Sequence, residues 1–192
     1  MEKAGAGRGV KMTDEMYYRC YIDGDETGLE ELMRKYGSPL TLYINGYLHD
    51  LHEAEDLMIE VFSYLFAKKP QIRDGGLKAY LYQSARHMAL RHKGRRRFYF
   101  SLEELKEEPE AEELIEEVVK KKERNQILHA CMDKLKADYR EVLYLVFFEG
   151  MRHAEAGLVM GKTEKQIADL VYRGKNSLKK RLKEEGITDA DY

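Results

Sequence analysis

Lys and Arg side chains are concentrated in two stretches of this 192-residue chain. The first stretch contains Arg91, Lys93, Arg95, Arg96 and Arg97, and the second extends from residue 173 to residue 183. Clustered cations contact the phosphates of nucleic acids, and they give affinity that depends on salt rather than on base sequence. The first stretch therefore predicts nucleic-acid contact, with a solvated basic run as the alternative interpretation.

The second basic stretch belongs to a predicted pair of helices joined by a tight turn, over residues 149–182. Gly161 is suited to the left-handed residue that closes the first helix. Thr163 then stands three residues before Gln166, which is the capping-box spacing at the start of a helix. The inward face of this second helix is predicted to hold Ile167, Val171, Gly174, Leu178 and Leu182. A basic outer face after a short glycine turn is typical of a helix-turn-helix that reads DNA, although any α-hairpin with a solvated basic face has the same periodicity.

Composition and periodicity indicate how these stretches are positioned. Hydrophobic residues make up 43% of the chain and charged residues 35%, and only three prolines occur. We predict an all-α protein of two small helical domains, an N-terminal helix bundle and a C-terminal helix-turn-helix bundle, joined by an acidic linker. The expected boundaries are a disordered tail at 1–12, the first domain at 13–97, the linker at 98–122, the helix-turn-helix domain at 123–186 and a tail at 187–192. Pro39 is expected in the first turn of a separate helix at 40–48.

Enzyme chemistry is not indicated by this sequence. His49 and His52 are three residues apart without a third ligand nearby, and no phosphate-binding loop, dinucleotide-binding turn or nucleophile constellation is present. We therefore expect no catalytic residue, no metal and no cofactor. Cys20 and Cys131 are isolated, which fits a reducing compartment. No apolar run approaches the roughly 18 residues of a membrane span, so we expect a cytoplasmic protein with no membrane span.

Two segments resemble the sigma factors of bacterial RNA polymerase of the extracytoplasmic-function (ECF) type. The first segment holds Ala54, Glu55, Asp56, Leu57, Glu60, Val61 and Phe62, followed by 79–82, 85–87 and an arginine run. The second is the predicted helix-turn-helix, introduced by Leu135, Arg140, Glu141, Val142, Leu143 and Leu145 and by Glu149–Gly150. Together the two segments extend the resemblance over about residues 23–182.

The resemblance implies a sigma factor that binds core RNA polymerase and directs promoter-specific initiation of transcription. Its first domain is expected to dock on a coiled coil of the β′ subunit and to read and melt the −10 element. Its second domain is expected to read the −35 element and to contact the β flap. Core RNA polymerase and promoter DNA are thus the expected partners, and many members of the family are also held by an anti-sigma factor.

The resemblance also assigns three groups of site residues. Those for docking on core polymerase are Glu53, Asp56, Ile59 and Glu60, where a solvated acidic face is the alternative. Those for −10 DNA binding and melting are Lys68, Lys69, Ile72, Arg73, Arg86, His87, Arg91, Lys93, Arg95, Arg96 and Arg97. Those for −35 DNA binding are Arg152, Thr163, Lys165, Gln166, Asp169 and Arg173, with Gln166 and Arg173 expected to read bases and with Arg152 and Thr163 expected to position the backbone.

Some interpretations stay open at the level of the sequence. The loop at 68–76 is either the melting loop that the resemblance implies or an ordinary connection between helices. The acidic linker is either a flexible spacer or, as in sigma factors, a segment that follows the RNA path of the polymerase. The whole chain is alternatively a stand-alone helix-turn-helix transcription regulator, or a sigma-like interaction module that does not read DNA.

Overall fold

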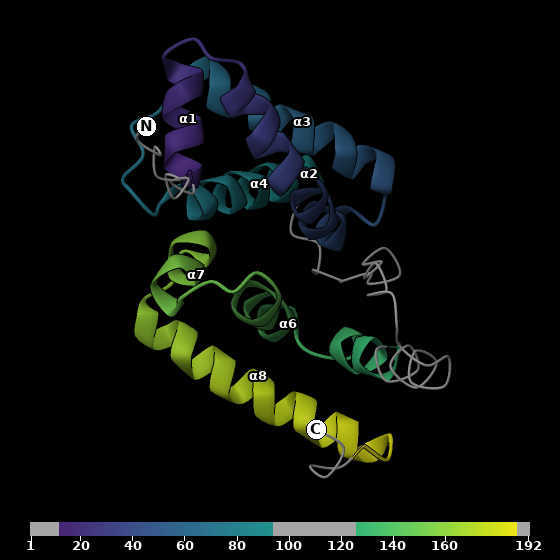
Figure 1. Cartoon of the computed structure of the whole chain (residues 1–192). Helices are drawn as coiled ribbons and strands as arrows, with labels where there is room; N and C mark the ends of the chain where they lie inside the picture. The colour runs from purple at the N-terminus through teal and green to yellow at the C-terminus, as the bar shows by residue number, and fades with distance from the viewer. Residues whose placement is uncertain (1–11, 94–125, 188–192) are drawn as a thin grey trace, which may run out of the picture.

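The structure is a computed structural model that describes residues 12–93 and 126–187, and all of its regular elements in these ranges are helical. The first bundle contains α1 (Asp14–Ile22), α2 (Thr27–Leu48), α3 (Leu51–Lys68) and α4 (Leu77–Lys93). The second contains a helical segment at 126–133, α6 (Ala137–Leu143), a π-helical turn η1 (Tyr144–Phe148), α7 (His153–Met160) and α8 (Glu164–Glu184). Figure 1 shows the two bundles one above the other, with α7 below α4. The predicted all-α class with two helical domains is confirmed; the predicted linker at 98–122 lies outside the described residues.

Local capping signals set the helix ends as predicted. The Oγ1 atom of Thr163 accepts a hydrogen bond from the backbone N–H of Gln166 at 3.3 Å, and the Gln166 side chain accepts one from the backbone N–H of Thr163 at 2.8 Å. This reciprocal pair confirms the capping box. Gly161 ends α7 with a left-handed φ of 66°, which confirms the predicted helix stop. Both ends of the turn between α7 and α8 are therefore fixed by local chemistry.

The expected break at Pro39 is wrong. Pro39 lies inside α2, which continues without interruption from Thr27 to Leu48. Proline removes one backbone donor and disfavours the helix interior, but large side chains on both sides of it are fully packed. Leu32, Tyr36, Leu40 and Tyr43 are each at most 3% exposed. Packing of both halves of α2 in the core thus outweighs the local penalty of the proline.

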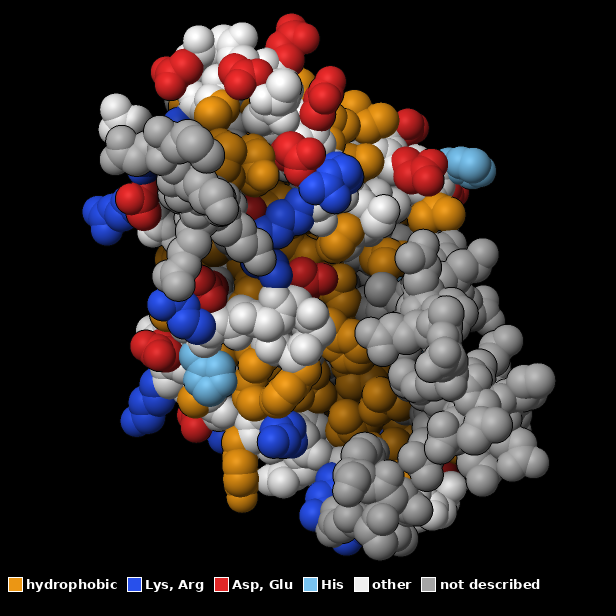
Figure 2. Space-filling view, in the orientation of Figure 1, with side chains coloured by type: hydrophobic (Ala, Val, Ile, Leu, Met, Phe, Trp, Pro, Cys, Tyr) orange, Lys and Arg blue, Asp and Glu red, His pale blue; other side chains and the backbone are white. Residues whose placement is uncertain are grey.

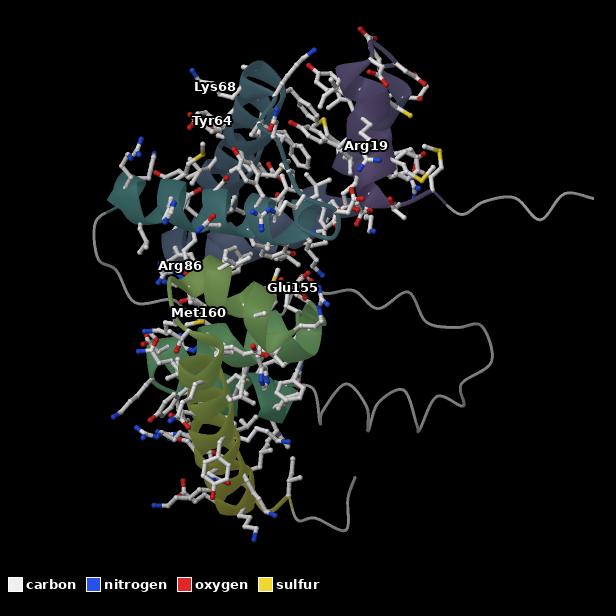
Figure 3. The ribbon with its side chains drawn as sticks, turned by 90° about the vertical axis from the view of Figure 1, so that its left-hand side faces the viewer. Arg19, Tyr64, Lys68, Arg86, Glu155 and Met160 are labelled. Carbon is white, nitrogen blue, oxygen red and sulfur yellow. The ribbon has the colours of Figure 1, made fainter. Side chains whose placement is uncertain are left out.

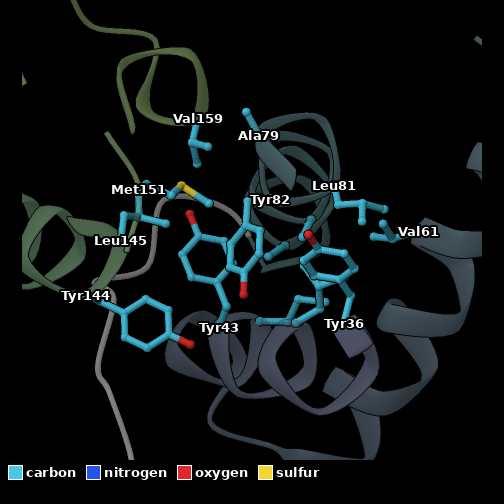
Figure 4. Close-up of a cluster of buried hydrophobic side chains, with 14 of the residues drawn as sticks. Tyr36, Tyr43, Val61, Ala79, Leu81, Tyr82, Tyr144, Leu145, Met151 and Val159 are labelled. Carbon is cyan, nitrogen blue, oxygen red and sulfur yellow. The ribbon is translucent and has the colours of Figure 1, made fainter. Parts of the chain in front are cut away.

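One continuous hydrophobic core extends through both bundles. The ring of Tyr43 in α2 stacks on that of Tyr144 at a centroid distance of 5.8 Å, and it lies 5.1 Å from the ring of Tyr82 in α4. Met151 and Val159 from the second bundle are buried in the same cluster (Figure 4). The two domains therefore pack directly against each other, with α4 against α7.

Candidate nucleic-acid interface and the contact between the domains

The helix-turn-helix is formed by α7, the turn at 161–163 and α8. Ile167 and Val171 are buried on the inner face of α8. A Cβ atom at Gly157 would lie 2.6 Å from the carbonyl oxygen of Lys162, so glycine allows the turn to approach α7 closely. The inner face is the one that the periodicity predicts, and the opposite face of α8 is turned to solvent.

The outer face of α8 brings together several of the residues predicted to contact −35 DNA. Lys165, Asp169 and Arg173 are all exposed there. Gln166 is also exposed, but its side-chain oxygen accepts the capping hydrogen bond from Thr163. Reading a base through this oxygen would require the cap to open. Tyr172 is 70% exposed on the same helix and was not predicted as a site residue. The sequence feature that could have identified it is its position directly before Arg173.

Arg152 and Thr163 stand at the starts of α7 and α8, respectively. Arg152 stands immediately before α7, and its Nη2 atom lies 2.9 Å from Oε1 of Glu155. The hydrogen bond from the Arg152 side chain lowers the pKa of Glu155 below its usual value, against the opposing effect of burial. Thr163 caps α8 through Oγ1. These two predicted residues therefore lie at helix ends rather than on the outer face of α8.

The predicted polymerase-docking residues lie along α3. Asp56 and Glu60 are exposed, and Ile59 between them is 50% exposed. Glu53 differs from them, because it is half-buried in the first turn of α3, where its backbone N–H donates to Oδ1 of the capping residue Asp50. Tyr64, 45% exposed and four residues after Glu60, extends the exposed face toward Lys68, as Figure 3 shows. Spacing along the helix was the signal for including Tyr64.

The loop between α3 and α4 places its cations at the surface. Lys68, Lys69 and Arg73 are exposed, and Lys69 closes α3 in a left-handed conformation with a φ of 45°. Ile72 is half-buried and packs against the hydrophobic core, and its contact with a base stays a prediction. The loop therefore presents three cations, and Nζ of Lys69 lies 5.2 Å from the centroid of the Tyr21 ring.

The cations assigned to α4 fall into different environments. His87 and Arg91 are exposed, and Lys93 is the last residue of the helix. Arg95, Arg96 and Arg97 lie outside the described residues. Figure 2 shows one face of the molecule, on which Asp and Glu side chains gather over the first bundle and hydrophobic side chains extend across its middle.

Arg86 is not at the open surface but at the contact between the domains. Its Nε atom donates to Oε1 of Glu141 at 2.8 Å, and the two side chains are 21% and 4% exposed. Burial lowers the pKa of Arg86, but the charge of Glu141 and its hydrogen bond, together with Tyr47 and Tyr43, outweigh burial, and the pKa is raised overall. Figure 3 shows Arg86 where α4 meets the second bundle. In this arrangement Arg86 is held by the second domain rather than presented to DNA.

Further polar contacts join the same face of α4 to the second domain. Lys78 Nζ lies 3.1 Å from Oε2 of Glu149, and Tyr144 donates to Oε1 of the same carboxylate at 2.8 Å. Gln83 Nε2 donates to the backbone oxygen of Leu158 at 2.9 Å. Lys78 and Arg86 are eight residues apart, which places them on one side of a helix. The α4 helix therefore forms most of the polar contact between the domains.

Within residues 12–93 and 126–187, no group of three or more His, Cys, Asp or Glu side chains is arranged to hold a metal ion. Among the helices that the structure describes, none is both long and apolar enough to cross a membrane. The geometry thus consists of polar, cationic and apolar contact surfaces.

Comparison with known proteins identifies the class of the chain. Residues 125–178, which contain α6 to most of α8, match the family model described as sigma-70, region 4. The chain is 23% identical to the ECF RNA polymerase sigma factor SigE of Mycolicibacterium smegmatis over 181 residues, which cover 90% of this chain and 70% of that protein. It is 21% identical to the ECF RNA polymerase sigma factor SigM of Bacillus subtilis, over 84% of this chain and 98% of that protein. The second bundle thus matches sigma-70 region 4, and the chain as a whole is similar to ECF-type sigma factors.

Solved structures agree with this ECF-type fold. The structure of CnrH in complex with the cytosolic domain of CnrY matches with a TM-score of 0.62 at 18% identity, over 93% of this chain and 99% of that one. The sigma factor RpoE in complex with the anti-sigma factor NepR from Bartonella quintana matches with a TM-score of 0.57 at 22% identity, over 81% and 96%. ECF-type sigma factors act in transcription initiation and are not a class of enzymes.

Proposed function

We propose that this chain is an ECF-type sigma factor that binds core RNA polymerase and directs it to specific promoters. The observation that carries the proposal is the match of residues 125–178 to sigma-70 region 4, together with an α8 helix whose outer face presents Lys165 and Arg173 to solvent. A helix of this kind enters the major groove and contacts base edges and phosphates. The second domain therefore reads the −35 element, with Arg173 as the strongest candidate for a base or phosphate contact.

The first domain docks on polymerase through α3 in this proposal. Asp56, Ile59 and Glu60 give an exposed face that combines two carboxylates with an apolar side chain. Such a face complements a basic helical partner, for which charge sets orientation and association rate. The exposed cations Lys68, Lys69 and Arg73 of the following loop, with His87 and Arg91 of α4, then lie along the same domain for contact with −10 DNA.

An anti-sigma factor is a further proposed partner. Two of the structural neighbours, CnrH and RpoE, are seen in complex with CnrY and with the anti-sigma factor NepR, respectively. The proposed place of action is the cytoplasm, where core polymerase and promoter DNA are present. The anti-sigma factor and core polymerase then compete for the same free sigma factor.

Binding to core polymerase tests the proposal against its alternatives. The purified chain is mixed with core polymerase, and the mixture is separated by size-exclusion chromatography, with gel shifts on duplex DNA in the presence and absence of polymerase. We expect co-elution with core and a sequence-dependent shift that requires polymerase. A specific shift without polymerase would instead identify a stand-alone regulator, and co-elution without any DNA shift would identify an interaction module that does not read DNA.

A further inference from the structure

Three hydrogen-bond donors of the first domain converge on a single carboxylate oxygen of the second. Oε1 of Glu141 accepts from the hydroxyl of Tyr43 at 2.8 Å, from the hydroxyl of Tyr47 at 2.6 Å and from Nε of Arg86 at 2.8 Å. Tyr43 and Tyr47 are four residues apart on α2 and so share one face of it. Arg86 approaches the same point from α4. The first domain thus forms a compact set of donors, and the second supplies the anion.

The donor set is suited to anions in general rather than to a carboxylate alone. A guanidinium and two hydroxyls pointing at one oxygen make charge-assisted hydrogen bonds, which phosphate oxygens accept as readily as carboxylate oxygens. Arg and Tyr side chains are also among the groups that contact DNA phosphates. The chemistry of these three residues therefore fits a backbone phosphate of DNA.

The position of the donor set links it to the proposed DNA path. Arg86 directly precedes His87 on α4, and Arg91 follows one and a half turns later; both of these are exposed. The second domain covers the donor set through Glu141 and through the ring of Tyr144, which stacks on that of Tyr43. A DNA strand that follows α4 would reach the donor set if the second domain moved away.

We propose that Tyr43, Tyr47 and Arg86 form a phosphate-binding site of the first domain and that Glu141 occupies it while the two domains are packed together. This inference rests on the proposed function, because it takes promoter DNA to be the source of the phosphate. Domain closure and DNA binding at α4 then exclude each other. This inference requires core polymerase to separate the two domains before Arg86 contacts DNA.

Packing of the two domains against each other is measured with a cysteine introduced into the surface that this packing covers. Val159 is 1% exposed and belongs to the cluster between the domains (Figure 4). In a Val159→Cys chain, modification of the introduced thiol by a maleimide, followed by peptide mass spectrometry, reports how often the domains open. The second measurement is the affinity for a short fluorescent single-stranded DNA at low salt. It uses the full chain of each variant without the Val159→Cys substitution.

Glu141→Gln and Arg86→Gln are expected to separate opening from phosphate binding. Each variant removes one charge of the Arg86–Glu141 ion pair and should raise the thiol modification rate about tenfold or more. Glu141→Gln should bind DNA more tightly, because apparent affinity follows the populated open fraction. Arg86→Gln should bind DNA more weakly than Glu141→Gln by about tenfold or more, because it also loses a phosphate contact. The matched control Glu185→Gln removes a carboxylate from an exposed ion pair with Lys134 and should change neither measurement.

Several results would overturn the inference. Equal strengthening of DNA binding in Glu141→Gln and Arg86→Gln would make Arg86 a purely structural partner of Glu141. An unchanged thiol modification rate in Glu141→Gln would show that the Glu141 carboxylate does not hold the two domains together. If Glu141→Gln fails to fold, Tyr47→Phe, which keeps the ring and removes one donor, must raise the modification rate or the inference is wrong. If the unmodified chain does not direct transcription by core polymerase, the proposed function is wrong. The thiol measurement would still test whether Glu141 holds the two domains together.

Discussion

The turn of the helix-turn-helix depends on Gly157, although its position inside a helix does not itself favour glycine. Gly157 lies inside α7, where alanine would favour the helix by about 0.5–1 kcal/mol. An added Cβ atom would however lie 2.6 Å from the backbone oxygen of Lys162, which belongs to the turn and has little freedom to move. Forcing extra volume into a packed site destabilises by about 1–3 kcal/mol. We therefore expect Gly157→Ala to lower the free energy of unfolding by up to about 2.5 kcal/mol after the helix-propensity gain is subtracted.

Gly37 supplies a matched control for this substitution. It lies in the interior of α2, and an added Cβ atom there would have no heavy atom of another described part of the chain within 4 Å. We expect Gly37→Ala to raise the free energy of unfolding by about 0.5–1 kcal/mol, the helix-propensity term alone. Urea unfolding followed by circular dichroism measures both variants, and each kcal/mol corresponds to about 2–4 °C in Tm for a chain of this size. Equal stabilisation by the two alanines would refute the close approach of the turn to α7.

Three further predictions concern binding and pH. Charge reversal of Asp56 and Glu60 to Lys should weaken binding to core polymerase, chiefly through a slower association measured by surface plasmon resonance, whereas the same reversal at Glu26 and Glu30 should leave the rate unchanged. Arg173→Ala should weaken binding of the polymerase complex to promoter DNA by about 1–3 kcal/mol in a gel-shift titration, and an unchanged affinity would make α8 a scaffold. Burial lowers the pKa of His129 below its usual 6.5, so the unfolded chain takes up the proton first as pH falls. The free energy of unfolding should therefore decrease between about pH 7 and pH 5, and it should decrease less in His129→Gln; identical pH profiles would contradict this reasoning.

Local chemistry explains why much of the helix-turn-helix was predictable. Gly161 ends α7 and Thr163 begins α8 as expected, because each signal depends on residues within a few positions of the helix end. The inward positions Ile167 and Val171 follow from a periodicity that is visible in the sequence. Gln166 shows the limit of this reasoning. Its spacing is compatible with both a capping role and a base-reading role, and only the geometry shows its oxygen at the cap.

Long-range packing explains what the sequence did not reveal. Pro39 carries a local signal for a helix start, but contacts made by distant parts of the core hold α2 as a single helix. Arg86 and Glu141 are 55 residues apart in sequence, and no local spacing rule connects them. Arg86 was accordingly predicted as a surface contact to DNA together with His87. A pair of opposite charges at such a separation has many possible partners, and only the packing of α4 against the second domain selects one.

Run-off transcription with purified core polymerase tests the central claim most directly. Promoter fragments are first selected from a random duplex pool by binding to the mixture of core polymerase and this chain, and the selected fragments then serve as templates. We predict transcripts with a defined start site that appear only when the chain is present and that decrease strongly with Arg173→Ala. Transcription from the selected fragments that is equal with and without the chain would contradict its role as a promoter-specific sigma factor.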